Sequence, residues 1–211
     1  MQLNFITFDV FLGITEVIGL LAFAVSGLIA GLRKKLDPVG ICIVTGLTAF
    51  GGGTLRDILL DRRPFFWVEN SYWLWLILAL TLLGTIVIKK QHIEFTERAI
   101  QVPDAVGLSS SVILGTQIAL QFNMPAIVSI LMGVVSAVFG GVLRDIVCSE
   151  IPKAFSDHRP YAVLAFLGSA FYILMHQNGI NPLIAFLTAF IFTVGLRLMA
   201  IFRAWNLPRL G

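Results

Sequence analysis

One seven-residue pattern that occurs twice constrains the fold of this chain more than any other feature. Residues 52–58 read GGTLRDI and residues 140–146 read GGVLRDI, at an offset of 88 residues. The same offset pairs other residues without a gap: Glu16 with Asp104, Gly19 with Gly107, Leu20 with Leu108, Gly27 with Gly115, Leu32 with Leu120, Ala49 with Ala137 and Pro64 with Pro152. Matches at one constant offset indicate an internal duplication, so the fold must contain two related units.

Both copies of the pattern lie within long apolar segments. The chain of 211 residues is 57% hydrophobic and 13% charged, whereas about 25% of the residues are charged in ordinary soluble domains. A helix needs about 20 mostly apolar residues to cross a bilayer. Seven segments are candidates, at 12–32, 38–60, 72–88, 103–120, 125–148, 160–176 and 182–202. We therefore expect an all-α integral membrane protein, a single transmembrane domain over residues 1–211 with seven transmembrane helices. They leave no room for a catalytic head, so we expect no enzymatic activity.

The duplication and the number of segments together predict an inverted repeat. Residues 12–90 and residues 100–176 each contain three apolar segments. Because three is odd, the second unit enters the membrane from the opposite side. Residues 182–203 are then an additional C-terminal helix outside the repeat.

The distribution of Lys and Arg predicts the orientation of the chain. Basic residues follow the first, third, fifth and seventh apolar segments, as Arg33, Lys34, Lys35, Lys89, Lys90, Arg98, Lys153, Arg159, Arg203 and Arg209. Loops rich in Lys and Arg stay in the cytoplasm. The N-terminus is therefore expected outside and the C-terminus in the cytoplasm, in the cell inner membrane.

Two equivalent helix faces carry small or hydroxyl side chains and end in an arginine. The residues on these faces are Thr45, Thr48, Gly52 and Arg56 in the first unit, and Gly133, Ser136, Gly140 and Arg144 in the second. Spacings of three and four residues place each set on one side of a helix. Asp57 and Asp145 point about 100° away from the arginines before them, so each arginine is predicted to pair with a carboxylate on another helix.

The paired glycines allow two interpretations. In the first, small residues simply let two membrane helices pack closely. In the second, Gly51, Gly52 and Gly53, and likewise Gly140 and Gly141, kink the helices and free carbonyl groups that face a wet cavity. Carbonyl oxygens can replace the hydration shell of a cation, and this second interpretation is the one we favour. The candidate pore-lining side chains are Thr45, Thr48, Ser136, Ser26 and Ser110, so the path is placed among the segments 12–32, 38–60, 103–120 and 125–148.

The acidic residues Glu16 and Asp104 are paired by the repeat, and Asp104 follows Pro103 at an expected helix start. They either cap their helices at the membrane surface or attract cations. Together with Arg56, Asp57, Arg144 and Asp145 they form a predicted gating or charge network. Tyr161 flanks a segment and is expected to be an interfacial anchor.

Other classes of site lack their sequence signals. Cys42 and Cys148 are isolated, and the three histidines show no metal-ligand spacing. No Gly-Lys-Ser/Thr follows the glycine run, and no basic patch is interleaved with exposed aromatics. We expect no metal, cofactor, nucleotide or nucleic acid; the only ions expected are transported K⁺ or Na⁺.

These features resemble the prokaryotic TRIC family, the trimeric intracellular cation channels, which overlaps the glycine-transporter domain family UPF0126. The resemblance rests on the 3+3+1 arrangement and on Gly-Gly-x-Leu-Arg-Asp in the second and fifth segments. It implies a homotrimer surrounded by membrane lipids, in which each protomer has its own pore for monovalent cations, chiefly K⁺, near the glycine kinks. One departure is Phe139, which stands where the first copy has Gly51.

Three functions remain open at this point. A passive cation channel explains the polar helix faces, but it requires that carboxylates neutralise the arginines. A secondary transporter of a small zwitterionic amino acid such as glycine is the alternative, in which Arg56 binds a carboxylate near a half-helix N-terminus. A membrane scaffold without transport is the third.

Overall fold

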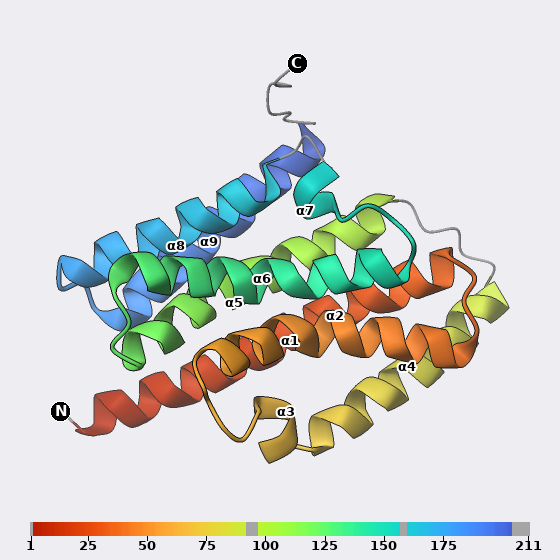
Figure 1. Cartoon of the computed structure of the whole chain (residues 1–211), viewed down its shortest axis with the longest axis horizontal. Coiled ribbons are helices and arrows are strands. Elements are labelled where there is room, and N and C mark those ends of the chain that lie inside the picture. Colours follow the sequence, from red (N-terminus) through yellow and green to blue (C-terminus); the bar gives the residue numbers. More distant parts are fainter. Residues whose placement is uncertain (1, 92–96, 157–159, 204–211) are drawn as a thin grey trace.

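The computed structural model describes residues 2–91, 97–156 and 160–203, and within them every regular element is a helix. Seven of these helices are long and two are short, and Figure 1 shows their arrangement. Their bounds are α1 Gln2–Arg33, α2 Pro38–Leu59, α3 Phe66–Glu69, α4 Tyr72–Gln91, α5 Glu97–Gln121, α6 Ala126–Val147, α7 Lys153–Ser156, α8 Tyr161–Gln177 and α9 Pro182–Phe202. The prediction of an all-α chain is confirmed for the described residues.

The turns at the helix ends repeat at the same offset as the sequence. Lys35 and Asn123 both have a φ of 56°, and Asp61 and Ser149 have φ values of 51° and 55°. Each residue ends a helix in the left-handed conformation, and the following N–H bonds back to the last turn. The duplication is therefore present in the backbone as well as in the sequence.

Four helices form the centre of the molecule. The helices α1, α2, α6 and α5 pack in a ring, each against the next. In Figure 1, α8 and α9 lie along one side of this ring, against α6 and α5, and α4 lies along the other side against α2. The seven long helices run along the long axis in alternating directions. The ring contains the four segments among which the sequence placed the path.

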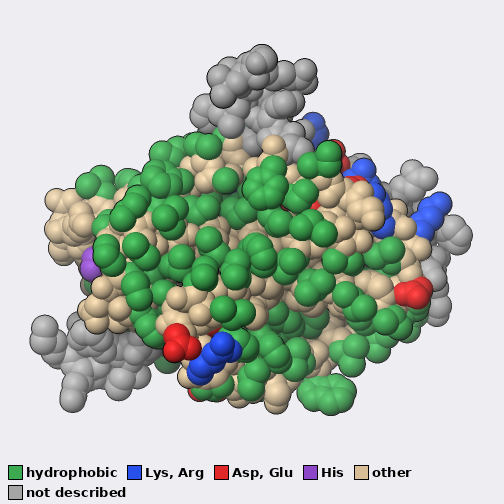
Figure 2. Space-filling model, in the orientation of Figure 1, with side chains coloured by type: hydrophobic (Ala, Val, Ile, Leu, Met, Phe, Trp, Pro, Cys, Tyr) green, Lys and Arg blue, Asp and Glu red, His purple; other side chains and the backbone are tan. Residues whose placement is uncertain are grey.

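The surface of the molecule suits a hydrocarbon environment. Many large apolar side chains are exposed on the long helices, among them Ile14, Ile43, Trp75, Leu83, Leu131 and Ile191. Figure 2 shows apolar side chains over most of the visible face, with Lys and Arg gathered mainly towards one end. Among the described residues, four stretches are long and apolar enough to cross a membrane, namely Val10–Arg33, Pro38–Leu59, Ala126–Val147 and Pro182–Phe202. Tyr72–Val87 and Tyr161–Gln177 are shorter apolar helices. The chain is a helical membrane protein.

Two predicted helix starts are wrong. The structure starts α1 at Gln2 and α5 at Glu97, not at residues 12 and 103, so Pro103 lies inside α5. Packing explains why α5 extends upstream of a proline, since Ile100 is buried against Ile29 and Val44. Glu16 and Asp104 consequently lie inside helices, and the interpretation that they cap helix ends is wrong.

Candidate functional site

The two glycine motifs meet where α2 crosses α6. A Cβ atom on Gly52 would overlap the carbonyl oxygen of Ser136, and one on Gly140 would overlap the carbonyl oxygen of Thr48. The two contacts are related by the 88-residue offset. Only a residue without a side chain lets the two backbones approach this closely. The glycines therefore serve the packing of α2 against α6.

The half-helix N-terminus that the transporter hypothesis requires is absent from α2 and α6. The α-helix is continuous through residues 51–53 in α2 and through residues 140 and 141 in α6. A continuous helix has no half-helix N-terminus at the glycines. A bend of α2 or α6 at these glycines, with the helix itself continuous, remains a prediction.

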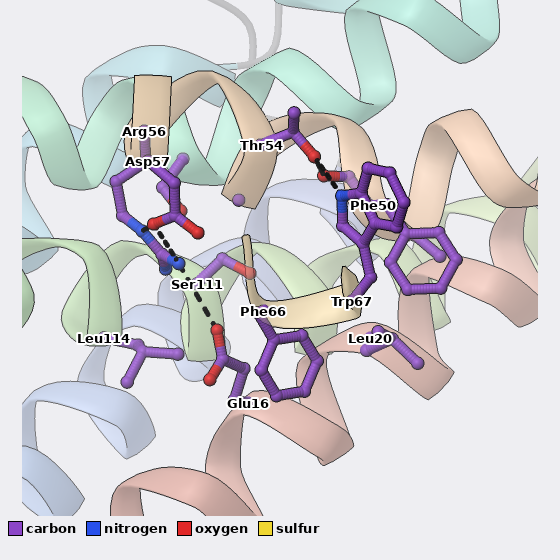
Figure 3. A pocket seen from close by; sticks show the side chains of 13 residues that line it. Glu16, Leu20, Phe50, Thr54, Arg56, Asp57, Phe66, Trp67, Ser111 and Leu114 are labelled. Atoms are coloured by element: carbon purple, nitrogen blue, oxygen red, sulfur yellow. Dashed lines mark hydrogen bonds and ion pairs between the residues drawn. The ribbon is translucent and has the colours of Figure 1, made fainter. Parts of the chain in front are cut away.

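A cluster of charged side chains from α1 and α2 surrounds Arg56, and we refer to Glu16, Arg56 and Asp57 as the Arg56 cluster. The Nε of Arg56 donates to Oδ1 of Asp57 at 2.8 Å, and its Nη2 lies 3.3 Å from Oε1 of Glu16. Arg56 and Asp57 are buried, whereas the Glu16 side chain is 16% exposed. Figure 3 shows the three side chains converging.

The second repeat builds the equivalent group, which we call the Arg144 cluster: Asp104, Arg144 and Asp145. Nε of Arg144 donates to Oδ1 of Asp145 at 2.8 Å, and Nη1 donates to Oδ1 of Asp104 at 2.6 Å. Nη1 also donates to the hydroxyl of Ser26, in the other repeat, at 2.7 Å. The side chains of all three cluster members are at most 5% exposed. This cluster is more tightly bonded than the Arg56 cluster.

The structure corrects one part of the predicted charge pairing. Each arginine does bond the aspartate beside it, because a long guanidinium side chain can fold back along the helix although the two Cβ atoms diverge. The prediction that each arginine pairs with a carboxylate on another helix is confirmed, since Arg56 also pairs with Glu16 on α1, and Arg144 with Asp104 on α5. Both of these pairs are 40 residues apart.

The two clusters border pockets of different volume. The Arg56 cluster borders a pocket of about 40 Å³, room for roughly two or three water molecules, which Figure 3 shows. The lining includes Glu16, Gly53, Arg56, Asp57, Ser111 and Ser136. The pocket beside Arg144 and Asp145 has only about 10 Å³. The Arg56 cluster therefore has the larger space beside it.

The five candidate pore-lining residues have different surroundings, and only one of them lines the pocket at the Arg56 cluster. Ser136 borders the pocket at the Arg56 cluster. Thr45 and Thr48 are fully buried and donate to carbonyls of their own helix. Ser26 is held by Arg144, as described above. Ser110 donates to its own helix, and its neighbour Ser111 borders the pocket instead.

Two residues of the site were missed. Tyr161, expected to be an interfacial anchor, is buried and donates to Oδ2 of Asp104 at 2.8 Å. Arg197 of α9 is 2% exposed, and its guanidinium carbon lies 4.4 Å from the centre of the Tyr161 ring. The sequence held one signal for Arg197, because an ionisable residue inside an apolar segment marks a functional site by default.

Metal-ligand geometry is absent from the part of the chain that the structure describes. No group of three or more His, Cys, Asp or Glu side chains there could hold a metal ion. Each arginine cluster mixes one cation with two carboxylates, which suits a charge network.

The two halves of the chain each match the same family model. The model, described as glycine transporter, matches residues 13–89 and residues 101–177. The start of the second match follows the start of the first by the same 88 residues that separate the two motifs.

Curated membrane proteins and solved channel structures are similar to almost the whole chain. The UPF0126 membrane protein of Vibrio cholerae serotype O1 is 33% identical over 192 residues, 91% of this chain and 79% of that protein. The UPF0126 inner membrane protein YadS of Escherichia coli K12 is 32% identical over 193 residues, 91% of each chain.

Among solved structures, the TRIC trimeric intracellular cation channel orthologue from Rhodobacter sphaeroides has a TM-score of 0.85 at 30% identity. It covers 92% of this chain and 98% of its own. A prokaryotic TRIC channel in 0.5 M KCl has a TM-score of 0.84 at 27% identity, covering 94% of this chain and all of its own.

Proposed function

Because the chain belongs to the UPF0126 family described by the glycine-transporter model, which overlaps the prokaryotic TRIC channels, we propose that it is a K⁺-permeable monovalent cation channel. It acts as a homotrimer in which each protomer contains its own pore. The solved structures similar to this chain are TRIC cation channels, and one of them is called trimeric.

The observation that carries the proposal is the charge of the Arg56 cluster. Its formal charges are −1 for Glu16, +1 for Arg56 and −1 for Asp57, which sum to −1 beside a pocket large enough for roughly two or three water molecules. Arg62 places its buried Nη1 3.6 Å from Oδ1 of Asp57, but its side chain as a whole is 31% exposed, so solvent screens its charge in part. An arginine held by two carboxylates repels a cation far less than a free one, which removes the main objection to a cation path.

The α2–α6 crossing is the proposed gate between the two clusters. The carbonyl oxygens of Thr48 and Ser136 lie against the glycines of the opposite helix, which leaves no room for an ion. A small separation of the two helices would uncover these oxygens to the path, where they can take the place of water molecules around K⁺. In this scheme the polar side chains of Thr45, Thr48, Ser136 and Ser26 lie beside the path, and Ser111 takes the place there that the sequence suggested for Ser110.

In the proposed topology the chain crosses the cell inner membrane seven times. The N-terminus lies outside and the C-terminus lies in the cytoplasm. Two observations support it. The seven long helices alternate in direction, and the ends of α1 and α6 bring the basic residues Arg33, Lys34 and Lys153 together.

Transport of a small zwitterion such as glycine is the second candidate, favoured by the description of the family model. This function needs a guanidinium free to bind a carboxylate, and a helix N-terminus beside it. Arg56 instead bonds two carboxylates of its own chain, and α2 is unbroken at the glycines. The geometry therefore favours the channel.

Flux into proteoliposomes tests both candidates. We expect K⁺ flux down its gradient without saturable uptake of labelled glycine, and several-fold less K⁺ flux in Glu16→Gln, because the pocket loses its net charge. Glu69→Gln is the matched control, since Glu69 is an exposed carboxylate of α3 that does not line the pocket. Saturable glycine uptake without K⁺ flux would replace the channel by the transporter.

A further inference from the structure

Arg197 is a buried cation that belongs to neither copy of the repeat. It lies in α9, about one and a half turns before the C-terminal end of that helix. Its side chain is 2% exposed, and Nε and Nη1 have no hydrogen-bond partner. A buried guanidinium with unpaired donors is costly, so a strong local field must stabilise it.

The Arg144 cluster supplies such a field. The guanidinium of Arg197 lies over the ring of Tyr161, and the hydroxyl of Tyr161 donates to Asp104. One aromatic side chain therefore separates Arg197 from the carboxylate that Arg144 also binds. Asp104, Arg144 and Asp145 sum to −1, and Arg197 brings the buried group to zero.

The Arg56 cluster has no equivalent of this arrangement. Position 73, which the repeat pairs with Tyr161, is Trp73, whose Nε1 finds no hydrogen-bond partner. The second cation near that cluster is Arg62, whose buried Nη1 lies 3.6 Å from Asp57 but whose side chain is 31% exposed, so solvent screens its charge more than that of Arg197, which is 2% exposed. The two ends of the path therefore differ in charge although the repeat makes their carboxylates and arginines equivalent.

We propose that Arg197 is a positioning and charge-balancing residue of the Arg144 cluster: it holds Tyr161 against Asp104 and cancels the net negative charge, so that this end of the path does not retain cations. The inference rests on the proposed function in that it assigns the cluster to the ion path. The additional helix α9 thereby gives the two halves of a duplicated protein unequal affinity for cations.

The test measures Tl⁺, a K⁺ substitute, binding to the detergent-solubilised protein, which requires no transport. In Arg197→Met the Arg144 cluster carries −1, and we expect Tl⁺ to bind on the order of tenfold to fiftyfold more tightly than in the wild type, the effect of one unit charge roughly 7–12 Å away at an effective dielectric constant near 20. Arg197→Lys keeps the charge and should bind as the wild type does. Arg197→Gln serves in place of Met if the apolar variant fails to fold.

Two further variants separate charge from packing. Arg203→Met removes an exposed cation from the end of the same helix and should leave Tl⁺ binding unchanged. The double variant Arg197→Met with Asp104→Asn returns the cluster to zero charge and should abolish the gain. The proposal is overturned if Arg197→Met binds Tl⁺ as the wild type does, if Arg197→Lys gains as much as Arg197→Met, or if the double variant keeps the gain.

Unitary K⁺ currents provide a second readout that depends on transport. The wild type should conduct unequally at opposite voltages, and Arg197→Met should bring the two currents closer to equality, while Arg197→Lys should conduct as the wild type does. If the wild type carries no current and Arg197→Met still gains Tl⁺ affinity, the channel function fails and the charge-balancing role of Arg197 stands. If the wild type conducts and Arg197→Met shows neither change, only this inference fails.

Discussion

Substituting Gly52 by Ala should separate α2 from α6. The new methyl group would overlap the carbonyl oxygen of Ser136, which belongs to the backbone of a continuous helix and cannot rotate away. Gly140→Ala would meet the carbonyl oxygen of Thr48 in the same manner. Two other glycines of α2 serve as controls, because a Cβ on Gly46 meets nothing within 4 Å and one on Gly53 lies 3.7 Å from Arg56.

The magnitude follows from two opposing effects. Overpacking a close contact costs about 1–3 kcal/mol, while Gly→Ala within a helix stabilises it by about 0.5–1 kcal/mol. The controls Gly46→Ala and Gly53→Ala receive only the second contribution. The helix stabilisation is common to all four variants and cancels, so we expect Gly52→Ala and Gly140→Ala to have a free energy of unfolding lower than the controls by roughly 1–3 kcal/mol.

Reversible unfolding by SDS in mixed micelles, followed by circular dichroism, measures these differences. The glycine contact predicts that Gly52→Ala and Gly140→Ala unfold at a clearly lower SDS fraction than both controls. If all four variants unfold together, the close backbone approach of α2 and α6 is refuted, and with it the proposed gate.

Two further predictions concern polar contacts away from the gate. Tyr172→Phe removes the 2.6 Å hydrogen bond to Gln117 and leaves a buried amide oxygen without its donor, which should lower the free energy of unfolding by about 1–3 kcal/mol; adding Gln117→Leu should recover part of the loss in the same SDS titration. At the helix ends, Glu150 pairs with Lys34. Burial alone would raise the pKa of Glu150, but the hydrogen bond to Lys34 and the charges of Lys34, Lys153 and Arg33 together outweigh burial, so the pKa is lowered. The ionised Glu150 therefore stabilises the folded protein fully at pH values above the ordinary carboxyl pKa. This stabilisation is lost as the pH falls through the lowered pKa. For a pair this exposed we expect less than about 1 kcal/mol, absent in Glu150→Gln, as measured by unfolding at several pH values.

Sequence periodicity predicted the helices well because hydrophobic segments of this length leave few alternatives in a membrane. It failed at the starts of α1 and α5, where Pro103 indicated a boundary. Burial of Ile100 against Ile29 and Val44 maintains α5 upstream of that proline. This tertiary packing cannot be read from one segment alone.

In the candidate site too, the sequence predicted some features, and others depend on tertiary packing. The constant offset singled out Glu16, Arg56, Asp104 and Arg144, and the structure joins them in two equivalent pairs. Whether the glycines break a helix or admit a neighbouring one depends on the carbonyl groups of the opposite helix, which the sequence cannot place. Arg197 has no counterpart in the repeat, so comparison of the two halves could not reveal it.

The central claim is that cations pass beside the Arg56 cluster in each protomer. Ser111→Cys, in a background where Cys42 and Cys148 are replaced, places a thiol on the wall of the pocket. Ser110→Cys is the control, because Ser110 is 1% exposed and bonds its own helix. The measurement is the unitary current in a planar bilayer under a KCl gradient, before and after a positively charged thiol reagent is added. The account predicts a current that reverses near the K⁺ equilibrium potential and that the reagent blocks in three steps in Ser111→Cys alone. A current that reverses near the Cl⁻ potential, or one that the reagent leaves unchanged in Ser111→Cys, would contradict it.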